Sequence, residues 1–161
     1  METAWETELA DLLNELSSTQ DELFDVLQQK RKFLMSADTA GMQSLQSRER
    51  DIVSRLEACQ RQRAELLARG GQDGLPSDSV RSLAAALPNS ARRELSKRVD
   101  DAARRASMLS HQSLTNWVLV QRSLIHLSQL LEIIATGGRP RPTYGKGESA
   151  PTSGSLVDRA A

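Results

Sequence analysis

The sequence predicts an all-α fold: an elongated antiparallel helical hairpin or three-helix coiled-coil bundle, with a long C-terminal helix and a disordered tail. Ala, Glu, Lys, Leu and Arg make up 73 of the 161 residues, a share typical of long helices. Apolar residues recur every three or four positions, a spacing that returns side chains to one helix face. Aromatic residues are only 3%, which suits a thin seam between helices better than a thick globular core.

The first two predicted helices cover residues 3–36 and 39–69 and are antiparallel, because residues 36–38 leave only a short connection. Thr3 and Glu6 have capping-box spacing at the start of the first helix. Gly70 and Gly71 predict the end of the second. The first seam is Trp5, Leu9, Leu12, Leu16, Thr19, Leu23, Val26 or Leu27, Phe33 and Leu34. The second is Met42, Leu45, Glu49, Ile52, Leu56, Cys59, Arg63 and Leu66.

A short helix is expected at residues 78–87, ended by Pro88, and a long one at residues 89–136, capped by Asn89 or Ser90. Residues 1–136 are therefore predicted to form the helical bundle. Residues 137–161 are rich in Gly, Pro, Ser and Ala and nearly lack apolar side chains. Such a segment buries too little surface to offset its ordering entropy, so a flexible tail is expected.

The long predicted helix has two unlike halves. Residues 92–105 carry nine charges, whereas residues 106–136 carry only two, Arg122 and Glu132. We expect this helix to run parallel to the first, with the basic part beside the acids of residues 2–25. Its predicted seam is Leu95, Val99, Ala102, Ala106, Leu109, Ser113, Trp117, Val120, Leu124, Leu127, Leu131 and Ile134.

Composition narrows the function classes. The net charge is zero, which removes any global attraction to nucleic acid or anionic membrane. The single cysteine excludes an internal disulfide and suits a reducing compartment. The acidic N-terminus lacks the features of a secretory signal, and no uninterrupted apolar run reaches the roughly 18–20 residues that span a bilayer. We therefore expect a cytoplasmic protein without membrane insertion.

No residue pattern predicts an enzyme, a cofactor or a metal. His111 and His126 lie fifteen residues apart on one helix, about 22 Å, so they cannot share a proton or a metal within one chain. Cys59 falls on a seam and has no nearby Cys or His in the sequence, which favours a packing role. The basic stretch is interleaved with acids and lacks stacking aromatics, which argues against nucleic-acid binding.

The apolar half of the long helix carries the strongest functional signal. Its apolar face is wider than one neighbouring helix needs, because further residues extend it: Leu114, Val118, Leu119, Ile125, Leu130 and Ile133. Its length also predicts an overhang of some 20 Å beyond the hairpin, near residues 123–136. A ledge of this kind is an aggregation hazard unless something covers it. A partner helix, a second copy of the chain, or the protein's own core could each do so.

The segment NWVLVQRSLIHLSQLLEIIATGG, followed by PTYGKG, resembles the C-terminal signature of bacterial flagellar export chaperones of the FlgN type. The resemblance is specific over residues 116–147, and the order of helices agrees across most of the chain. It implies a chaperone that holds unpolymerised hook–filament junction proteins by their C-terminal helices. It also implies delivery of these clients to the flagellar type III export gate. A self-associating coiled-coil adaptor without a client is the alternative.

By position, the resemblance assigns client binding to Trp117, Val120, Leu124, Leu127, Leu131 and Ile134, and Ser113 adjoins them on the predicted seam. It assigns docking on the export gate to Tyr144, with Gly145 beside it.

Overall fold

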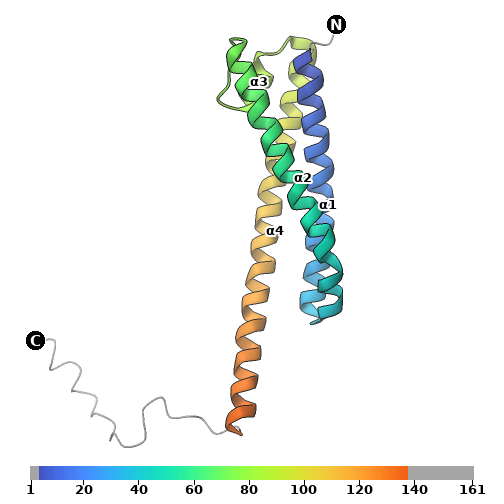
Figure 1. Cartoon of the computed structure of the whole chain (residues 1–161), viewed down its shortest axis with the longest axis vertical. Helices are drawn as coiled ribbons and strands as arrows, with labels where there is room; N and C mark the ends of the chain where they lie inside the picture. The colour runs from blue at the N-terminus through green and yellow to red at the C-terminus, as the bar shows by residue number, and fades with distance from the viewer. Residues whose placement is uncertain (1–3, 138–161) are drawn as a thin grey trace, which may run out of the picture. The chain divides into compact units, whose positions relative to one another are not determined.

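The computed structural model describes residues 4–137 as four helices, with no strand in this range (Figure 1). The helices are α1 (Ala4–Met35), α2 (Thr39–Gln72), α3 (Val80–Ala86) and α4 (Asn89–Thr136). The all-α fold class predicted from the sequence is therefore confirmed. Contacts between residues divide the chain into a first unit that ends at Gln121 and a second that begins at Arg122. Each unit is described by itself below. The predicted tail lies outside the described residues except for Gly137.

A tight turn joins α1 to α2 and makes them antiparallel (Figure 1). Asp38 is the N-cap of α2, and its carboxylate accepts a hydrogen bond from the Gly41 amide at 2.8 Å. Gly41 is required at this position, since a Cβ there would lie 2.5 Å from the Phe33 ring. The turn also holds Ala37 at a φ of 53°, a left-handed conformation unusual for a residue with a side chain.

The predicted end of α2 at Gly70 and Gly71 is wrong, because the helix continues to Gln72. The positive φ of +76° that helps to reverse the chain belongs to Gly74. Gly70 serves packing instead. It is buried, and a Cβ there would lie 3.4 Å from the Leu83 side chain, so the missing side chain allows a close approach of α3.

Local capping accounts for the start of α3 and α4. Ser79 and Ser82 form a reciprocal capping box at the start of α3. The predicted caps of α4, Asn89 and Ser90, are both helical residues. The carbonyl of Pro88 accepts hydrogen bonds from the amides of Ala91 and Arg92 at 3.1 and 3.0 Å, so Pro88 takes the N-cap position, one residue before the expected cap.

In the first unit, α4 runs parallel to α1 and is held by side chains that reach backbone carbonyls. Arg98 donates to the carbonyl of Ala10 at 3.2 Å, and Gln20 donates to the carbonyl of Ala102 at 3.0 Å. Further along, Asn116 donates to the carbonyl of Leu27 at 2.9 Å. Residue numbers therefore rise together along both helices, which is the parallel arrangement expected from the sequence.

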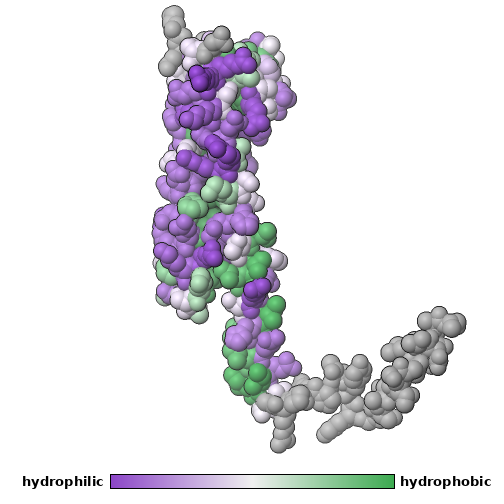
Figure 2. All heavy atoms as spheres, turned by 180° about the vertical axis from the view of Figure 1, so that it is seen from behind, coloured by the Kyte–Doolittle hydropathy of each residue, from purple (hydrophilic) through white to green (hydrophobic). Residues whose placement is uncertain are grey.

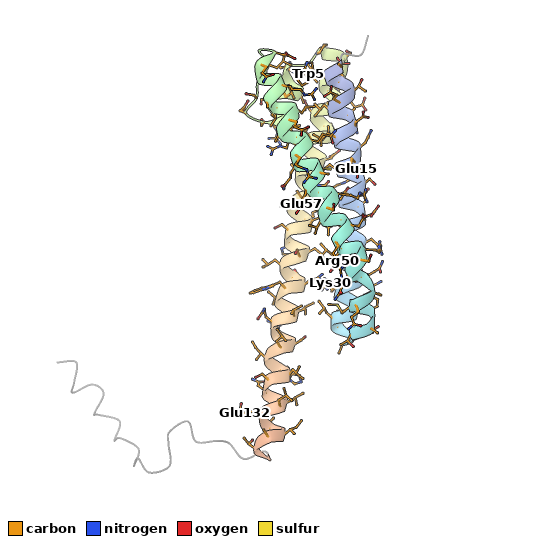
Figure 3. All side chains as sticks on the ribbon, in the orientation of Figure 1. Trp5, Glu15, Lys30, Arg50, Glu57 and Glu132 are labelled. Atoms are coloured by element: carbon orange, nitrogen blue, oxygen red, sulfur yellow. The ribbon has the colours of Figure 1, made fainter. Side chains whose placement is uncertain are left out.

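The buried apolar residues of the first unit form two clusters. The larger one joins all four helices through Leu9, Leu13, Leu66, Leu83, Ala84, Leu87 and Leu95. Trp5 packs against this cluster and lies near α3, as Figure 3 shows. The smaller cluster contains Val26, Leu45 and Ile52 from α1 and α2 alone. The core is therefore thickest around α3 and thins toward the turn of the hairpin.

Candidate functional site

The basic part of α4 contacts α1 at only two of its six bases. Arg105 pairs with Asp21 at 3.4 Å, and Arg98 donates to Asn14. The other four bases, Arg92, Arg93, Lys97 and Arg104, are exposed. The expectation that this whole stretch offsets the acids of α1 is therefore corrected.

The acids of α1 find their main partners on α2 instead. Arg55 pairs with Glu15 at 2.8 Å and with Glu22 at 2.9 Å, and Arg48 pairs with Asp25 at 3.0 Å. Arg69 pairs with Glu8. In the opposite sense, Lys30 of α1 pairs with Glu49 of α2 at 2.7 Å; Figure 3 labels Glu15 and Lys30 of these pairs. Hydrogen bonds from these arginines lower the pKa values of Glu8, Glu15 and Asp25. The short connection between α1 and α2 aligns the two helices along their length. The bases of α2 therefore lie beside the acids of α1 and pair with them.

The seam of α4 departs from the predicted one after Leu109. Leu95 and Leu109 are buried as expected, but the next buried position is Asn116, which is 3% exposed. Ser113 is exposed and Trp117 is 58% exposed, so neither lies on the seam against α1. Asn116 continues the seven-residue spacing of Leu95, Ala102 and Leu109. The two successive steps of four in the predicted seam would have turned it away from α1.

Asn116 is the residue that sequence reasoning missed. Its amide nitrogen donates to Leu27 in α1, while its buried side-chain oxygen has no hydrogen-bond partner among the described residues. An amide in an apolar seam fixes helix register at a cost in stability. The seven-residue spacing from Leu95 through Ala102 and Leu109 was the signal that could have identified it.

The second unit exposes nearly every side chain of α4 that it contains. Every residue from 122 to 135 is exposed, and seven of these are large aliphatic residues. Their exposed fractions run from 42% at Leu130 to 76% at Ile134. The set is Leu124, Ile125, Leu127, Leu130, Leu131, Ile133 and Ile134. The apolar residues of this unit appear green in Figure 2.

These side chains form a stripe. Leu124, Leu127, Leu131 and Ile134 follow steps of three, four and three, which places them on one face of the helix. Gln129 lies on the opposite face by the same spacing. The exposed stripe has the form that helix-in-groove recognition uses, with anchors at about every fourth residue. In the first unit, Trp117 is exposed and Val120 is half-buried.

Length and composition alone would also allow α4 to cross a membrane. Its most apolar stretch carries few charges and is not buried. A helix that exposes an apolar stripe for a protein partner meets the same criterion, so this observation is weak evidence for a membrane span.

The groups considered for catalysis differ in burial and in the unit that contains them. Cys59 is buried, and burial raises the pKa of its thiol, which disfavours the reactive thiolate. His111 is an exposed residue of the first unit, and His126 is an exposed residue of the second. Between residues 4 and 137, no three His, Cys, Asp or Glu side chains are grouped to hold a metal ion. Tyr144 and Gly145 lie outside the described residues.

Comparison with known proteins identifies the family. The model of the FlgN protein family matches residues 1–152, which is nearly the whole chain. Neither the curated proteins nor the solved structures searched contain a match to the chain. The family match agrees with the resemblance of residues 116–147 and with the all-α fold. The chain therefore belongs to the FlgN family of flagellar chaperones.

Proposed function

We propose that this chain is a cytoplasmic export chaperone that binds unpolymerised hook–filament junction proteins and delivers them to the flagellar type III export gate. Family membership supports a chaperone role in flagellum assembly. The observation that carries the proposal is the exposed aliphatic stripe at residues 122–136. The client element is an amphipathic C-terminal helix, whose apolar face packs along Leu124, Leu127, Leu131 and Ile134.

Binding of such a helix needs no catalysis or cofactor. Burial of roughly 1,000 Å² of apolar surface at about 25 cal/mol per Å² contributes a gross free energy near 25 kcal/mol. Ordering of the client and loss of its free motion remove most of this amount. The surplus corresponds to micromolar to nanomolar affinity. While bound, the client helix is unavailable for assembly into the growing structure.

Calorimetry with a junction-protein C-terminal peptide tests the proposal. The wild-type chain should bind the peptide with 1:1 stoichiometry. Leu124→Asp and Leu131→Asp should each abolish binding, since a carboxylate in the stripe must be desolvated against the client. Gln129→Asp is the matched control, because it adds the same charge to the opposite face. Circular dichroism should show equal helicity in all three variants. Normal binding by both stripe variants would show that the site is elsewhere.

Ser113, Trp117 and Val120 form the part of the proposed site that lies in the first unit. Trp117 and Trp5 are the two tryptophans of the chain, so Trp5→Phe leaves Trp117 as the single indole. If the client covers Trp117, its fluorescence should shift to shorter wavelength when the peptide is added. An unchanged spectrum at saturation would exclude Trp117 from the site.

The tail carries the second part of the proposal. We assign docking on the export gate to Tyr144 and Gly145. In this assignment, residues 137–161 act as a recognition element that is separate from the helical bundle. Tyr144→Ala should reduce secretion of junction proteins in motile cells and leave peptide binding unchanged. Normal secretion by this variant would remove Tyr144 from the proposal.

The competing function is a self-associating adaptor without a client. The exposed stripe favours it as well, because two stripes could cover each other. Absence of 1:1 peptide binding, together with a stable dimer through residues 113–134, would decide for the adaptor.

A further inference from the structure

The first unit contains an apolar groove of about 580 Å³ lined by residues of α1, α2 and α4 and by Val80 of α3. Leu16 and Leu23 of α1 and Leu56 of α2 are half-buried along it. Cys59, Ala102 and Ala106 also line it, and their small side chains leave the space unfilled. Close-packed interiors rarely leave an apolar space of this size empty, so the groove has the dimensions of a binding site.

A polar group inside the groove points to an occupant. Gln20 is 4% exposed, and its amide nitrogen donates to the carbonyl of Ala102. Its side-chain oxygen is buried at the groove and has no hydrogen-bond partner among the described residues. A buried acceptor is unfavourable unless something donates to it. An occupant with a hydroxyl, amide or imidazole donor would satisfy this oxygen.

The second unit supplies a helix of matching chemistry and length. Residues 122–136 present an aliphatic stripe along about 22 Å of helix. The groove extends along α1 from Leu12 to Leu23, about 16 Å. The segment also contains the donors His126 and Ser128. Both surfaces are apolar and uncovered, so each is suited to bury the other.

A second copy of the chain is the occupant that the covalent structure allows. Val99 and Leu109 of α4 line the groove, and residues 122–136 continue the same helix. A chain cannot place this segment in its own groove while α4 remains an unbroken helix. We propose that two copies exchange residues 122–136, each copy laying its segment in the groove of the other.

An exchange of this kind closes on itself as a twofold dimer and buries two equivalent interfaces. Each inserted helix covers on the order of 500 Å² on each side, so the dimer buries on the order of 2,000 Å², above the roughly 1,600 Å² of a standard interface. The α4 helices of the two copies pair antiparallel, with residue 129 of one copy beside residue 104 of the other. The twofold axis then lies near residues 116–117. The exposed Trp117 would then meet its counterpart at the centre.

Charge complementarity supports the same occupant. Arg63 lines the groove, is exposed, and makes no ion pair within the described residues. Glu132 is the single acidic residue of the segment that would enter (Figure 3). The positions along the helices also agree. In the antiparallel pairing, residue 132 of one copy lies opposite residue 101 of the other, and Val99, two residues away, lines the groove together with Arg63. We assign Glu132 of one copy as the partner of Arg63 in the other.

Sedimentation equilibrium over a concentration series tests the dimer. The wild-type chain should be a dimer at micromolar concentration. Ala106→Phe fills the groove and should give a monomer, whereas Ala64→Phe, at an exposed alanine of α2 outside the groove, should remain a dimer. A monomer at every concentration, or a dimer that Ala106→Phe leaves intact, would overturn the proposal.

A charge exchange keeps the proposal testable if Ala106→Phe disturbs folding. Arg63→Glu should weaken the dimer at least tenfold, since it sets two acids against each other at a surface position. The double variant Arg63→Glu with Glu132→Arg should recover most of that loss. Absence of recovery would remove the proposed pair and, with it, the proposed orientation of the segment.

The dimer has a regulatory consequence that rests on the proposed chaperone function. The segment in the groove is also the proposed client site, so client and second copy compete for it. The Ala106→Phe monomer should bind the junction-protein peptide at least as tightly as the wild type, whereas Leu131→Asp should lose both the peptide and the dimer. An intact dimer with no peptide binding would reject the chaperone function alone; peptide binding without a dimer would reject the exchange alone.

Discussion

The helix α4 contains two stretches that differ in the burial of their apolar side chains. Residues 95–109 bury the leucines of the seam, whereas residues 122–136 expose their large apolar side chains. The first stretch is highly charged, but its seam residues Leu95 and Leu109 are only 4% and 7% exposed. The second stretch carries two charges, and its seven large aliphatic side chains are all exposed. The more apolar sequence is therefore the less buried one. Residues 122–136 therefore form an exposed apolar surface of the kind that marks an interaction site.

The strongest test of this difference compares two leucines. Leu66 is completely buried in the four-helix cluster, and Leu66→Ala should lower the free energy of unfolding by about 2–5 kcal/mol. Leu131 is 57% exposed, and Leu131→Ala should change it by less than about 0.5 kcal/mol. Urea denaturation at a concentration where the chain is monomeric measures both. A similar loss for Leu131→Ala would show that residues 122–136 are part of a core.

Asn116 is the last buried residue of α4 among the described residues. Asn116→Ala should lower the free energy of unfolding by about 1 kcal/mol, because the carbonyl of Leu27 loses its side-chain donor. Hydrogen exchange should also become faster in residues 110–121, since α4 is less firmly held there. Gln121→Ala, at an exposed position, serves as the control and should leave both quantities unchanged. Unchanged exchange in Asn116→Ala would show that this amide does not hold α4.

The turn between α1 and α2 offers a smaller test that involves the hairpin alone. Asp38→Ala removes the N-cap of α2 and should cost about 1 kcal/mol or less, whereas Asp38→Asn should retain most of the stability. Thermal unfolding followed by circular dichroism measures both variants. Client binding should be unaffected, because the stripe lies in the second unit. Loss of client binding in Asp38→Ala at a temperature where it is folded would contradict this separation.

Acid should weaken the hairpin through its surface ion pairs, with the smallest effect expected. The pKa values of Glu8, Glu15 and Asp25 are lowered in the folded chain, so their contribution is complete above the unfolded-state pKa values. It is lost as the pH falls through the folded values. Stability should therefore be flat near neutrality and decline below about pH 4.5. Arg55→Gln, which removes the partner of Glu15, should make this decline shallower. An equally steep decline in that variant would exclude the Arg55 pairs as its cause.

The identity of the elements could be predicted because local chemistry decides it. Asp38 caps α2 through its own side chain, Pro88 separates α3 from α4, and repeated leucines define the amphipathic faces. These signals act over three or four residues, within reach of a single hydrogen bond or helical turn. The exposed stripe of the candidate site was also visible in the spacing of Leu124, Leu127, Leu131 and Ile134.

Other features depend on neighbours that are distant in sequence. Gly70 looked like a helix stop, but its missing side chain admits Leu83 of α3. The bases of α4 looked like partners for α1, but α2 pairs with most of those acids. The hydrogen bond of Asn116 requires the carbonyl of Leu27, 89 residues earlier in the chain, to lie opposite it. The local sequence pattern shows none of these three contacts, because each depends on which helix lies alongside.

Local sequence patterns therefore predict a set of long helices with an excess of apolar surface near the C-terminal end of the last one. The tertiary structure decided which apolar residues are buried and which acids are paired, and it created the groove around Gln20. The physical reason is that helix formation depends on hydrogen bonds between residues four apart, whereas burial depends on the surface that another helix supplies.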